Sequence, residues 1–305
     1  MLPALLLDPS RAHRVLDMCA APGSKSVQLL AMMEADNEGG AGSDGGGGHG
    51  RDAPGARGLL VANDASLPRA ISLTHRLTAV GVASPFCAVT SLDARWWPDT
   101  LLSGSGGGAG GGGSAGESNG TPLRFERVLC DVPCSGDGTL RKRHAHTPSW
   151  NADAAMDLHA TQCRLLMQGL RQLATDGVLV YSTCSFNPVE NEAVVAEALR
   201  ATRRAGSAGG GMGAFVLDDP RETHPHLFRG HADGGDSEGD GGGLYAAPGL
   251  RSWGAPADGP QSMQPPSGEA ERAWFDPLLA RCVRLMPHRA PGPARRPAVA
   301  RIVAT

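Results

Sequence analysis

Two cysteines of this chain stand where a thiol could do chemistry. Cys134 lies in the string CDVPCSGDGTLRK, Cys184 lies in YSTCSFNPVENE, and a serine follows each of them. Each cysteine comes just after a short apolar run that is typical of a buried strand. An ionised thiol is a nucleophile, whereas a buried thiol is usually a small apolar group. The shared context favours a reactive role for this pair, and for Cys87, Cys130 and Cys163 we expect the apolar one.

The acidic residues of the sequence gather at the same kind of position. Five segments follow the predicted strands, and four of them begin with an aspartate. In an open α/β sheet, ligands bind outside the carboxyl ends of the strands, so these segments predict one shared site. The five segments are residues 17–25, Asp64, Asp93, residues 131–138 and residues 183–187.

A turn rich in small residues, DMCAAPGSK at residues 17–25, follows the first predicted strand. Small residues let a ligand approach the backbone near the N–H groups of the next helix, although a plain strand-to-helix connection uses the same composition. Asp64 is placed to bind two ribose hydroxyls, or it caps the following helix. Asp93 could accept a hydrogen bond from an adenine amino group, or it is a lone acid in a loop. Together these residues predict a pocket for an adenosine-bearing cofactor, and the lack of Gly-x-Gly-x-x-Gly disfavours a nicotinamide enzyme.

The elements that must position these residues alternate between strand and helix. Strands are predicted at residues 14–18, 59–63, 86–90, 127–131 and 178–182, with two more at 282–286 and 299–304. Helices are predicted at residues 24–34, 68–80, 154–174 and 188–203, the third of them ended by Asp176-Gly177. Short apolar strands bracketed by helices predict an α/β fold with a mostly parallel seven-stranded sheet and helices on both faces.

Glycine separates the parts of the chain that can fold from those that cannot. Of the 43 glycines, 20 fall in residues 38–58 and 103–120, which hold too little apolar surface to pack and are predicted to be disordered. We therefore expect a catalytic core over residues 1–203, a mostly disordered segment over 204–271, and C-terminal strands over 272–305 that complete the sheet.

Charge and cysteine content limit the classes of partner. A net charge of −3 excludes a bulk polycation, so a nucleic-acid site would be a local patch. The stretch RKRHAH at residues 141–146 could bind phosphates, or it is a solvated surface. Seven cysteines in no disulfide or zinc pattern predict a reducing compartment and no metal. No apolar run is long enough to span a bilayer and no convincing signal peptide opens the chain, so we expect a nuclear (nucleolar) or cytoplasmic monomer that is not secreted.

Three strings of the sequence resemble a known enzyme family. DMCAAPGSK at residues 17–25, DVPCSG at 131–136 and STCS at 182–185 are similar, in type and order, to the Sun-domain (NSUN/RsmB type) RNA cytosine-5 methyltransferases. The longer strings PCSGDGTLRK and STCSFNPVENEAVV most resemble the eukaryotic branch that methylates tRNA. The match covers about residues 2–200 and resumes at RCVRLMPHRAPG. It implies a Rossmann-like S-adenosylmethionine-dependent methyltransferase fold, with RNA, above all tRNA, as the partner.

The resemblance also implies a role for each residue of the site. Cys184 would attack carbon 6 of cytosine, so that carbon 5 can take the sulfonium methyl group of S-adenosylmethionine, and Cys134 would assist proton loss and product release. Asp131 would bind nitrogen 3 of the base and contact the cofactor, and Lys25 would keep the site electropositive, which favours the thiolate. The residues expected to bind the cofactor are Cys19, Ala20, Ala21, Pro22, Gly23, Ser24, Lys25, Asp64, Asp93 and Asp131.

Three alternatives stay open. DNA cytosine-5 methyltransferases use a Pro-Cys nucleophile, which would exchange the roles of Cys134 and Cys184. The chain could be a catalytically silent RNA-associated scaffold, since family members carry an RNA-positioning region before the first strand and this chain begins almost at that strand. The substrate could be rRNA rather than tRNA. An amino-methyltransferase is excluded, because DVPC at residues 131–134 lacks the second proline and the aromatic residue of that motif.

Overall fold

The computed structural model describes residues 2–35, 58–80, 86–98, 122–138, 152–207, 214–228, 244, 246–250, 277–285 and 298–304. The predicted inserts at 38–58 and 103–120 lie outside these ranges, except for Gly58. Gly58 directly precedes the second strand, and its backbone N–H donates to the Arg11 carbonyl oxygen at 2.7 Å, so the prediction of disorder is wrong for this residue. The basic stretch at residues 141–146 also lies outside the described residues.

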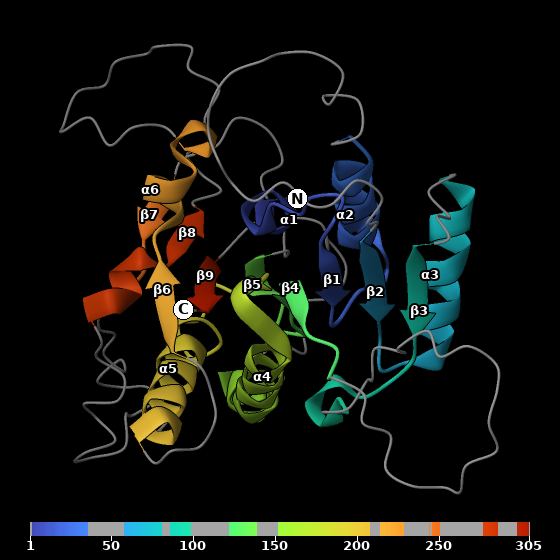
Figure 1. Ribbon diagram of the computed structural model, residues 1–305. Helices are drawn as coiled ribbons and strands as arrows, with labels where there is room; N and C mark the ends of the chain where they lie inside the picture. The colour runs from blue at the N-terminus through green and yellow to red at the C-terminus, as the bar shows by residue number, and fades with distance from the viewer. Residues whose placement is uncertain are drawn as a thin grey trace, which may run out of the picture.

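Five strands form a parallel half of one sheet. Their spatial order is β3 (Cys87–Thr90), β2 (Leu59–Asn63), β1 (Arg14–Asp17), β4 (Phe125–Asp131) and β5 (Leu173–Thr183), and neighbours are parallel (Figure 1). The chain runs outward from β1 to β3 and then returns to β4 on the other side of β1. The carboxyl ends of β1 and β4 therefore meet where the strand order reverses, which is where open α/β sheets bind ligands.

The C-terminal strands extend this sheet with antiparallel pairs. β9 (Ala298–Ala304) pairs with β5, while β6 (Phe215–Asp218) and β8 (Val283–Leu285) share the other edge of β9, and β7 (Ala246–Pro248) pairs with β8. The α/β class is confirmed, but the described sheet has nine strands where the sequence predicts seven. The two additional strands, β6 and β7, lie in residues 204–271, which the sequence predicts to be mostly disordered. They are too short to give a sequence signal and form against edges that β8 and β9 provide.

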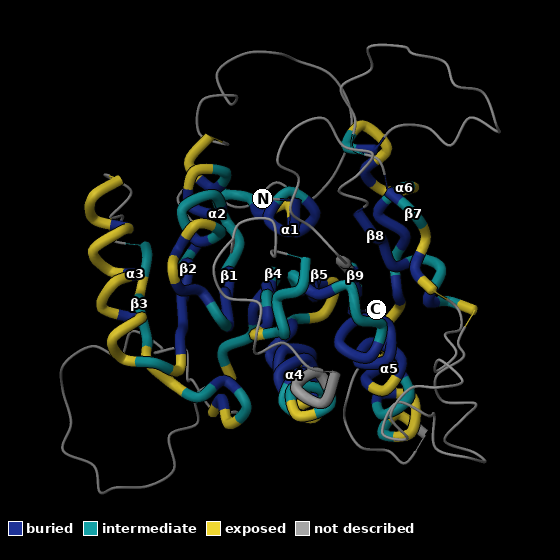
Figure 2. Tube along the Cα trace, turned by 180° about the vertical axis from the view of Figure 1, so that it is seen from behind, coloured by how far each residue is buried: buried dark blue, intermediate teal, exposed yellow. Residues whose placement is uncertain are grey.

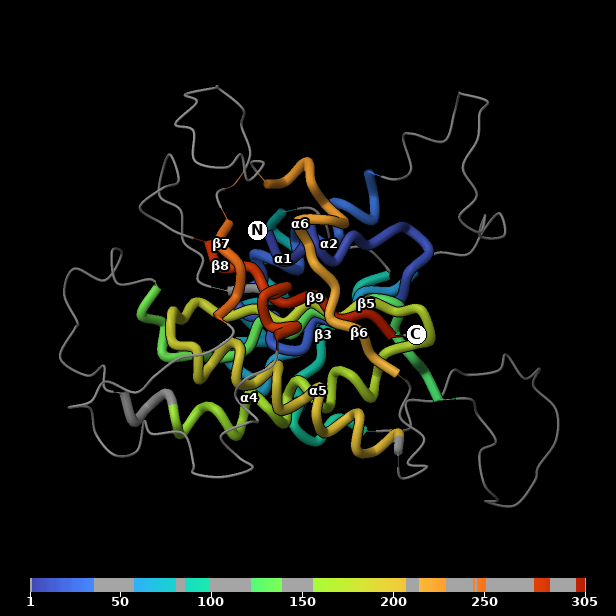
Figure 3. Tube along the Cα trace, turned by 90° about the vertical axis from the view of Figure 1, so that its left-hand side faces the viewer, coloured from blue at the N-terminus to red at the C-terminus, as the bar shows by residue number. Residues whose placement is uncertain are grey.

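Helices cover both faces of the sheet. α1 (Leu2–Leu7), α2 (Ser24–Ala35) and α3 (Leu67–Ala79) share one apolar cluster, while α4 (Ala152–Gln172) and α5 (Glu192–Ser207) contribute to the other. Figure 3 shows α4 and α5 together on one side of the strands, and α1 and α2 on the other. The central strands β1, β2, β4 and β5 are mostly buried, the edge strand β3 is only partly buried, and the outer faces of the helices are exposed (Figure 2). None of the described helices is both long and apolar enough to cross a membrane.

Short helical turns complete the fold, and several predicted boundaries are corrected, including the start of β5 at Leu173 rather than at 178. The short elements are η1 (Ala94–Trp96), α6 (Pro220–Thr223), η3 (Pro225–Leu227) and η5 (Pro277–Arg281). α4 ends at Gln172 rather than at 174, because residues 174–177 bulge out of the ladder between β4 and β5, with Asp176 at a φ of 59°. α5 begins at Glu192 rather than at 188, because residues 188–191 form turns.

Candidate active site

The turn between β1 and α2 folds back onto the end of β2. The backbone N–H of Ala20 donates to the Asn63 carbonyl oxygen at 2.7 Å, and the N–H of Gly23 donates to the Ala20 carbonyl oxygen at 2.8 Å. Gly23 has a φ of 97°, which L side chains rarely adopt, and a Cβ there would lie 2.7 Å from Leu73 Cδ1. Only glycine therefore fits this position, and the predicted turn is set by local chemistry.

Asp17 ends β1 and is buried beneath the same turn. Its Oδ2 accepts a hydrogen bond from Ser26 Oγ at 2.7 Å. The pKa of Asp17 is raised to about 7: burial is the main cause and the charge of Asp131 adds to it, while the Ser26 hydroxyl and Lys25 act in the opposite direction. The sequence places Asp17 in the predicted site but assigns it no role. Its signal was an acid that ends an otherwise apolar strand.

Asp64 joins the end of β2 to the turn. Its carboxylate accepts hydrogen bonds from the backbone N–H groups of Ala21 at 3.3 Å and Ser66 at 3.0 Å, and Arg69 Nη2 lies 3.3 Å from Oδ2. The N-cap residue of α3 is Ser66, so the alternative in which Asp64 caps this helix is wrong. A buried carboxylate at the end of the second parallel strand is an acceptor that can bind ribose hydroxyls, which is the role that the sequence predicts for Asp64.

Asn63, which the sequence analysis did not single out, connects the ends of three strands. Its Nδ2 donates to the carbonyl oxygens of Met18 at 3.1 Å and Leu92 at 2.9 Å. Its Oδ1 accepts from Thr90 Oγ1 and from the backbone N–H of Leu92, both at 2.9 Å. The amide therefore fixes the edge of the sheet on which Asp64 stands, and its signal was again a polar residue at the end of an apolar run.

Asp93 makes a local arrangement of its own. It caps η1 by accepting from the backbone N–H of Arg95 at 3.0 Å, and Arg95 Nη2 lies 2.6 Å from its Oδ2. The hydrogen bonds from this guanidinium lower the pKa of Asp93. In the part of the chain that the structure describes, no contact connects Asp93 to Asp64 or to the turn, so its assignment to the adenine stays a prediction.

Lys25, the last residue of the DMCAAPGSK string, lies next to Asp131, the first residue of the DVPCSG string. Lys25 Nζ, on the first turn of α2, is 2.5 Å from Asp131 Oδ2 at the end of β4. Ser182 Oγ at the end of β5 donates to Asp131 Oδ1 at 2.6 Å. Both carboxylate oxygens are therefore oriented by neighbours from two other elements, and the carboxylate connects α2, which follows the turn after β1, with the end of β5.

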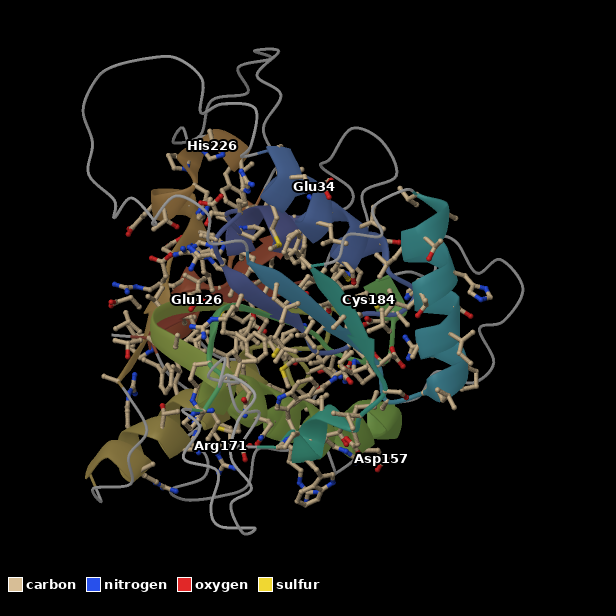
Figure 4. All side chains as sticks on the ribbon, turned by 45° about the vertical axis from the view of Figure 1, so that its right-hand side comes forward. Glu34, Glu126, Asp157, Arg171, Cys184 and His226 are labelled. Atoms are coloured by element: carbon tan, nitrogen blue, oxygen red, sulfur yellow. The ribbon has the colours of Figure 1, made fainter. Side chains whose placement is uncertain are left out.

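The two predicted reactive cysteines lie side by side in the loops after β4 and β5. The sulfur atoms of Cys134 and Cys184 are 3.0 Å apart, and the backbone N–H of Cys184 donates to Cys134 Sγ at 3.1 Å. Asp137 Oδ1 accepts from the backbone N–H of Phe186 at 2.8 Å, which ties the two loops together. Cys184 lies at the end of the sheet opposite to Glu126, which stands near the start of β4 (Figure 4).

The hydrogen bond between the two thiols gives Cys134 and Cys184 different pKa values. The hydrogen bond with Cys134 is the largest influence on Cys184 and lowers its pKa; Lys25 also lowers it, whereas burial and Asp131 raise it. The same hydrogen bond raises the pKa of Cys134, and burial and the charge of Glu190 add to this increase. The pair therefore favours a Cys184 thiolate beside a Cys134 thiol. Lys25 acts in the predicted direction, but the neighbouring thiol is the main cause.

Of the cysteines expected to be apolar, Cys130 is the clearest case, whereas Cys163 is buried but also contacts polar groups of α4 and α5. Cys130 is fully buried with its sulfur 3.1 Å from Met18 Sδ. Burial raises the pKa values of the Cys19, Cys130 and Cys163 thiols, and it raises that of Cys87 to about 11. None of the seven cysteines forms a disulfide.

A further group of polar side chains lies between α4 and α5. His159 Nε2 is 3.1 Å from Glu197 Oε2, its Nδ1 is 2.7 Å from the Val189 carbonyl oxygen, and Cys163 Sγ is 3.5 Å from both His159 Nε2 and Glu197 Oε2. Burial would lower the pKa of His159, but the hydrogen bonds to Glu197 and Val189 outweigh it and the pKa is raised. An ion pair between the two helices accounts for this arrangement.

Comparison with known proteins relates this site to an enzyme family. The family model described as 16S rRNA methyltransferase RsmB/F matches residues 52–215. The multisite-specific tRNA:(cytosine-C(5))-methyltransferase trm4b of Schizosaccharomyces pombe is 37% identical over 94% of this chain and 39% of its own length. The multisite-specific tRNA:(cytosine-C(5))-methyltransferase of Saccharomyces cerevisiae is 42% identical over 66% of this chain and 25% of its own length. The crystal structure of NSun6 from Pyrococcus horikoshii with SFG has a similar fold, with a TM-score of 0.55 and 17% identity over 99% of this chain and 50% of that chain. The chain thus spans well under half the length of these two curated relatives.

Proposed function

Because the chain belongs to the 16S rRNA methyltransferase RsmB/F family, we propose that it transfers a methyl group from S-adenosylmethionine to carbon 5 of a cytosine in RNA. One observation carries the proposal: two thiols lie 3.0 Å apart, next to a carboxylate that is held by Lys25 and Ser182. A Pro-Cys nucleophile acting alone needs no second thiol. The contact between Cys134 and Cys184 therefore favours the two-thiol RNA scheme over the exchange of roles.

The residues of the chain divide the chemistry between them. When bound, the cofactor supplies an electrophilic sulfonium methyl group, and Asp64 with the turn after β1 would hold it. The Cys184 thiolate adds to carbon 6 of the cytosine, which makes carbon 5 nucleophilic. As the thiolate adds, nitrogen 3 of the base takes up a proton from solvent, which it returns when the adduct breaks down, and the Asp131 carboxylate accepts a hydrogen bond from the resulting N–H. Lys25 and Ser182 keep this carboxylate oriented, so little reorganisation is needed as charge develops.

Cys134 acts after the methyl transfer. Once the Cys184 sulfur is bonded to carbon 6, it no longer accepts a hydrogen bond from Cys134, so the main cause that raises the pKa of Cys134 is removed. Cys134 can then lose its proton and take the proton from carbon 5. The bond between carbon 6 and the Cys184 sulfur breaks, which restores the aromatic ring and the thiolate.

We propose tRNA as the substrate, supported by the similarity to the two tRNA methyltransferases, and small-subunit rRNA as a second candidate, supported by the family description. The test incubates the purified chain with methyl-labelled S-adenosylmethionine and, in separate reactions, a tRNA pool and small-subunit rRNA, with Cys184→Ala as the control. Label at cytosines of tRNA supports the first substrate, and label confined to rRNA supports the second. Cofactor binding without label in either RNA would instead establish a silent scaffold.

We also propose that the protein works as a monomer in the nucleus (nucleolus) or the cytoplasm. Seven cysteines without a disulfide support a reducing compartment. A fluorescent fusion and sedimentation of the purified chain test the two statements separately.

A further inference from the structure

The residues on both sides of Cys134 are held by two buried side chains. Gln162 Nε2, on α4, donates to the carbonyl oxygen of Pro133 at 2.9 Å. Glu190, in the turns before α5, accepts from the backbone N–H of Ser135 at 2.8 Å and from Ser135 Oγ at 2.6 Å. Gln162 and Glu190 are both fully buried and bind each other at 3.1 Å. The peptide groups before and after the thiol are thus fixed from one side.

The Cys184 loop is held by a different group. Asn191 Oδ1 accepts from Thr183 Oγ1 at 2.6 Å, and Asn191 Nδ2 donates to the Ser185 carbonyl oxygen at 2.9 Å. Glu190 follows Cys184 in the chain by six residues, yet its carboxylate binds the loop that carries the other thiol. Removing the Glu190 carboxylate should therefore loosen the segment around Cys134, which Asp137 still ties to Phe186, while leaving the Cys184 loop anchored.

We propose that Glu190 and Gln162 are positioning residues that hold Cys134 against Cys184 and so control product release. This inference rests on the proposed methyl transfer, and it adds a role that the motif cysteines do not have. A carboxylate that is fully buried keeps its place because losing its donors leaves it unsatisfied. Because proton transfer depends on sub-ångström placement, displacing the Cys134 loop slows release, by about 10- to 100-fold.

The substitutions separate hydrogen bonding from charge. Glu190→Ala removes every acceptor and should accumulate a denaturant-resistant RNA adduct, with slow turnover. In Glu190→Gln, the amide oxygen still accepts from Ser135 N–H and the amide nitrogen can donate to Ser135 Oγ, so turnover should return to within a few-fold of wild type. Gln162→Met loses the bond to Pro133 and should show the same defect in weaker form, which keeps the test valid if Glu190→Ala does not fold.

Glu192 supplies the matched control. It is the same residue type, two positions later and equally buried, but it pairs with Arg284 on β8, with Nη2 at 2.5 Å and Nε at 2.6 Å, and accepts from the backbone N–H of Leu250 at 3.0 Å. Glu192→Gln should lower the melting temperature without changing the fraction of RNA that is trapped. A general loss of stability would affect both positions alike.

A second measurement is independent of RNA and cofactor. The chain is oxidised with diamide, which takes two hydrogens from the Cys134 and Cys184 thiols and becomes the hydrazine as the disulfide forms. Mass spectrometry of the peptides gives the rate. We expect it to fall by about tenfold in Glu190→Ala and to stay at the wild-type rate in Glu192→Gln.

The outcomes distinguish the inference from the proposed function. A wild-type chain that neither methylates RNA nor forms an adduct overturns the proposed function, whatever the diamide rates are. An active wild type whose Glu190→Ala variant is folded, releases product normally and oxidises at the wild-type rate overturns the positioning role. A Glu190→Gln variant as defective as Glu190→Ala overturns the hydrogen-bond assignment.

Discussion

The turn after β1 and the paired loops after β4 and β5 lie at the same edge of the sheet but are held in place differently. In the turn, most bonds join backbone groups to one another and to the end of the neighbouring strand, as between Ala20 and Asn63, and the Asp64 carboxylate adds a bond to the Ala21 N–H. In the cysteine loops, buried side chains make the bonds, and Ser135 and its partner Glu190 are 55 residues apart. The turn, which the sequence predicts to bind the cofactor, is one continuous segment of the chain. The thiol pair exists only when two distant loops are assembled.

The largest effect distinguishes the two thiols within the assembled region. Cys184→Ala and Cys134→Ala should each lower turnover by about 10⁴-fold or more, since a nucleophile and the group that completes its cycle act as a unit. Cys184→Ala cannot form the adduct, whereas Cys134→Ala should attack and methylate but accumulate a complex with RNA. Denaturing gels of each variant with tRNA and cofactor give the measurement. A trapped band in Cys184→Ala alone would reverse the two roles.

The next effect tests the cofactor side. Asp64→Ala removes a buried carboxylate from the end of β2 and should weaken S-adenosylmethionine binding by about 1–3 kcal/mol, because hydroxyl partners lose an acceptor. Calorimetry on the chain without RNA measures it. Asp93→Ala is the comparison, because the Asp93 carboxylate is paired with Arg95. Only a loss of cofactor affinity in this variant would support the assignment of Asp93 to the adenine. Equal affinity of wild type and Asp64→Ala would contradict the ribose assignment.

The stability of the fold should depend on pH through Asp17, which lies beneath the turn after β1. Asp17 has its pKa raised to about 7 in the fold, above its ordinary value of 3.8, so the folded chain holds a proton that the unfolded chain releases. The contribution of Asp17 to the free energy of unfolding is fully present below about pH 4. As the pH rises through about 7, up to about 4 kcal/mol of this contribution is lost. Asp17→Asn should therefore raise the melting temperature more at pH 8 than at pH 5. Identical shifts at both pH values would show that Asp17 is not protonated in the fold.

A smaller effect tests whether Cys134 lowers the pKa of Cys184. Cys134 is the main cause that lowers the pKa of Cys184, so Cys134→Ala should move alkylation of Cys184 by iodoacetamide to higher pH. Mass spectrometry of the Cys184 peptide follows the reaction, and Cys87→Ala is the control, because Cys87 lies on β3 away from the pair. An unchanged pH profile would mean that other groups, such as Lys25, set this pKa.

The smallest effect concerns the glycine-rich insert before β2. Replacing residues 38–57 with a short Gly-Ser loop should leave methylation within about threefold, because loop length changes closure entropy only slowly. Gly58 must stay, since a Cβ there would lie 2.1 Å from the His13 carbonyl oxygen. Gly58→Ala should lower the melting temperature where the loop replacement does not. Loss of cofactor binding in the shortened chain would show that the insert takes part in the site.

The sequence by itself determined the sheet class, the strands that carry the site and the residues at their ends. Apolar runs are local signals, and the φ of 97° at Gly23 favours glycine for a reason that lies in the backbone itself. The sequence could also place Cys134, Cys184 and Asp131 at strand ends, because the parallel order brings carboxyl ends to one edge.

Only the tertiary structure decided how those residues act on one another. The hydrogen bond that makes Cys184 the more acidic thiol, the buried pair that holds the Cys134 loop, and the contact of Lys25 with Asp131 all join side chains from different elements. The strands β6 and β7 form only where β8 and β9 provide edges for them. Hydrogen bonds and burial depend on distance in space rather than in sequence, so neither spacing nor composition could reveal which partner each buried group would find.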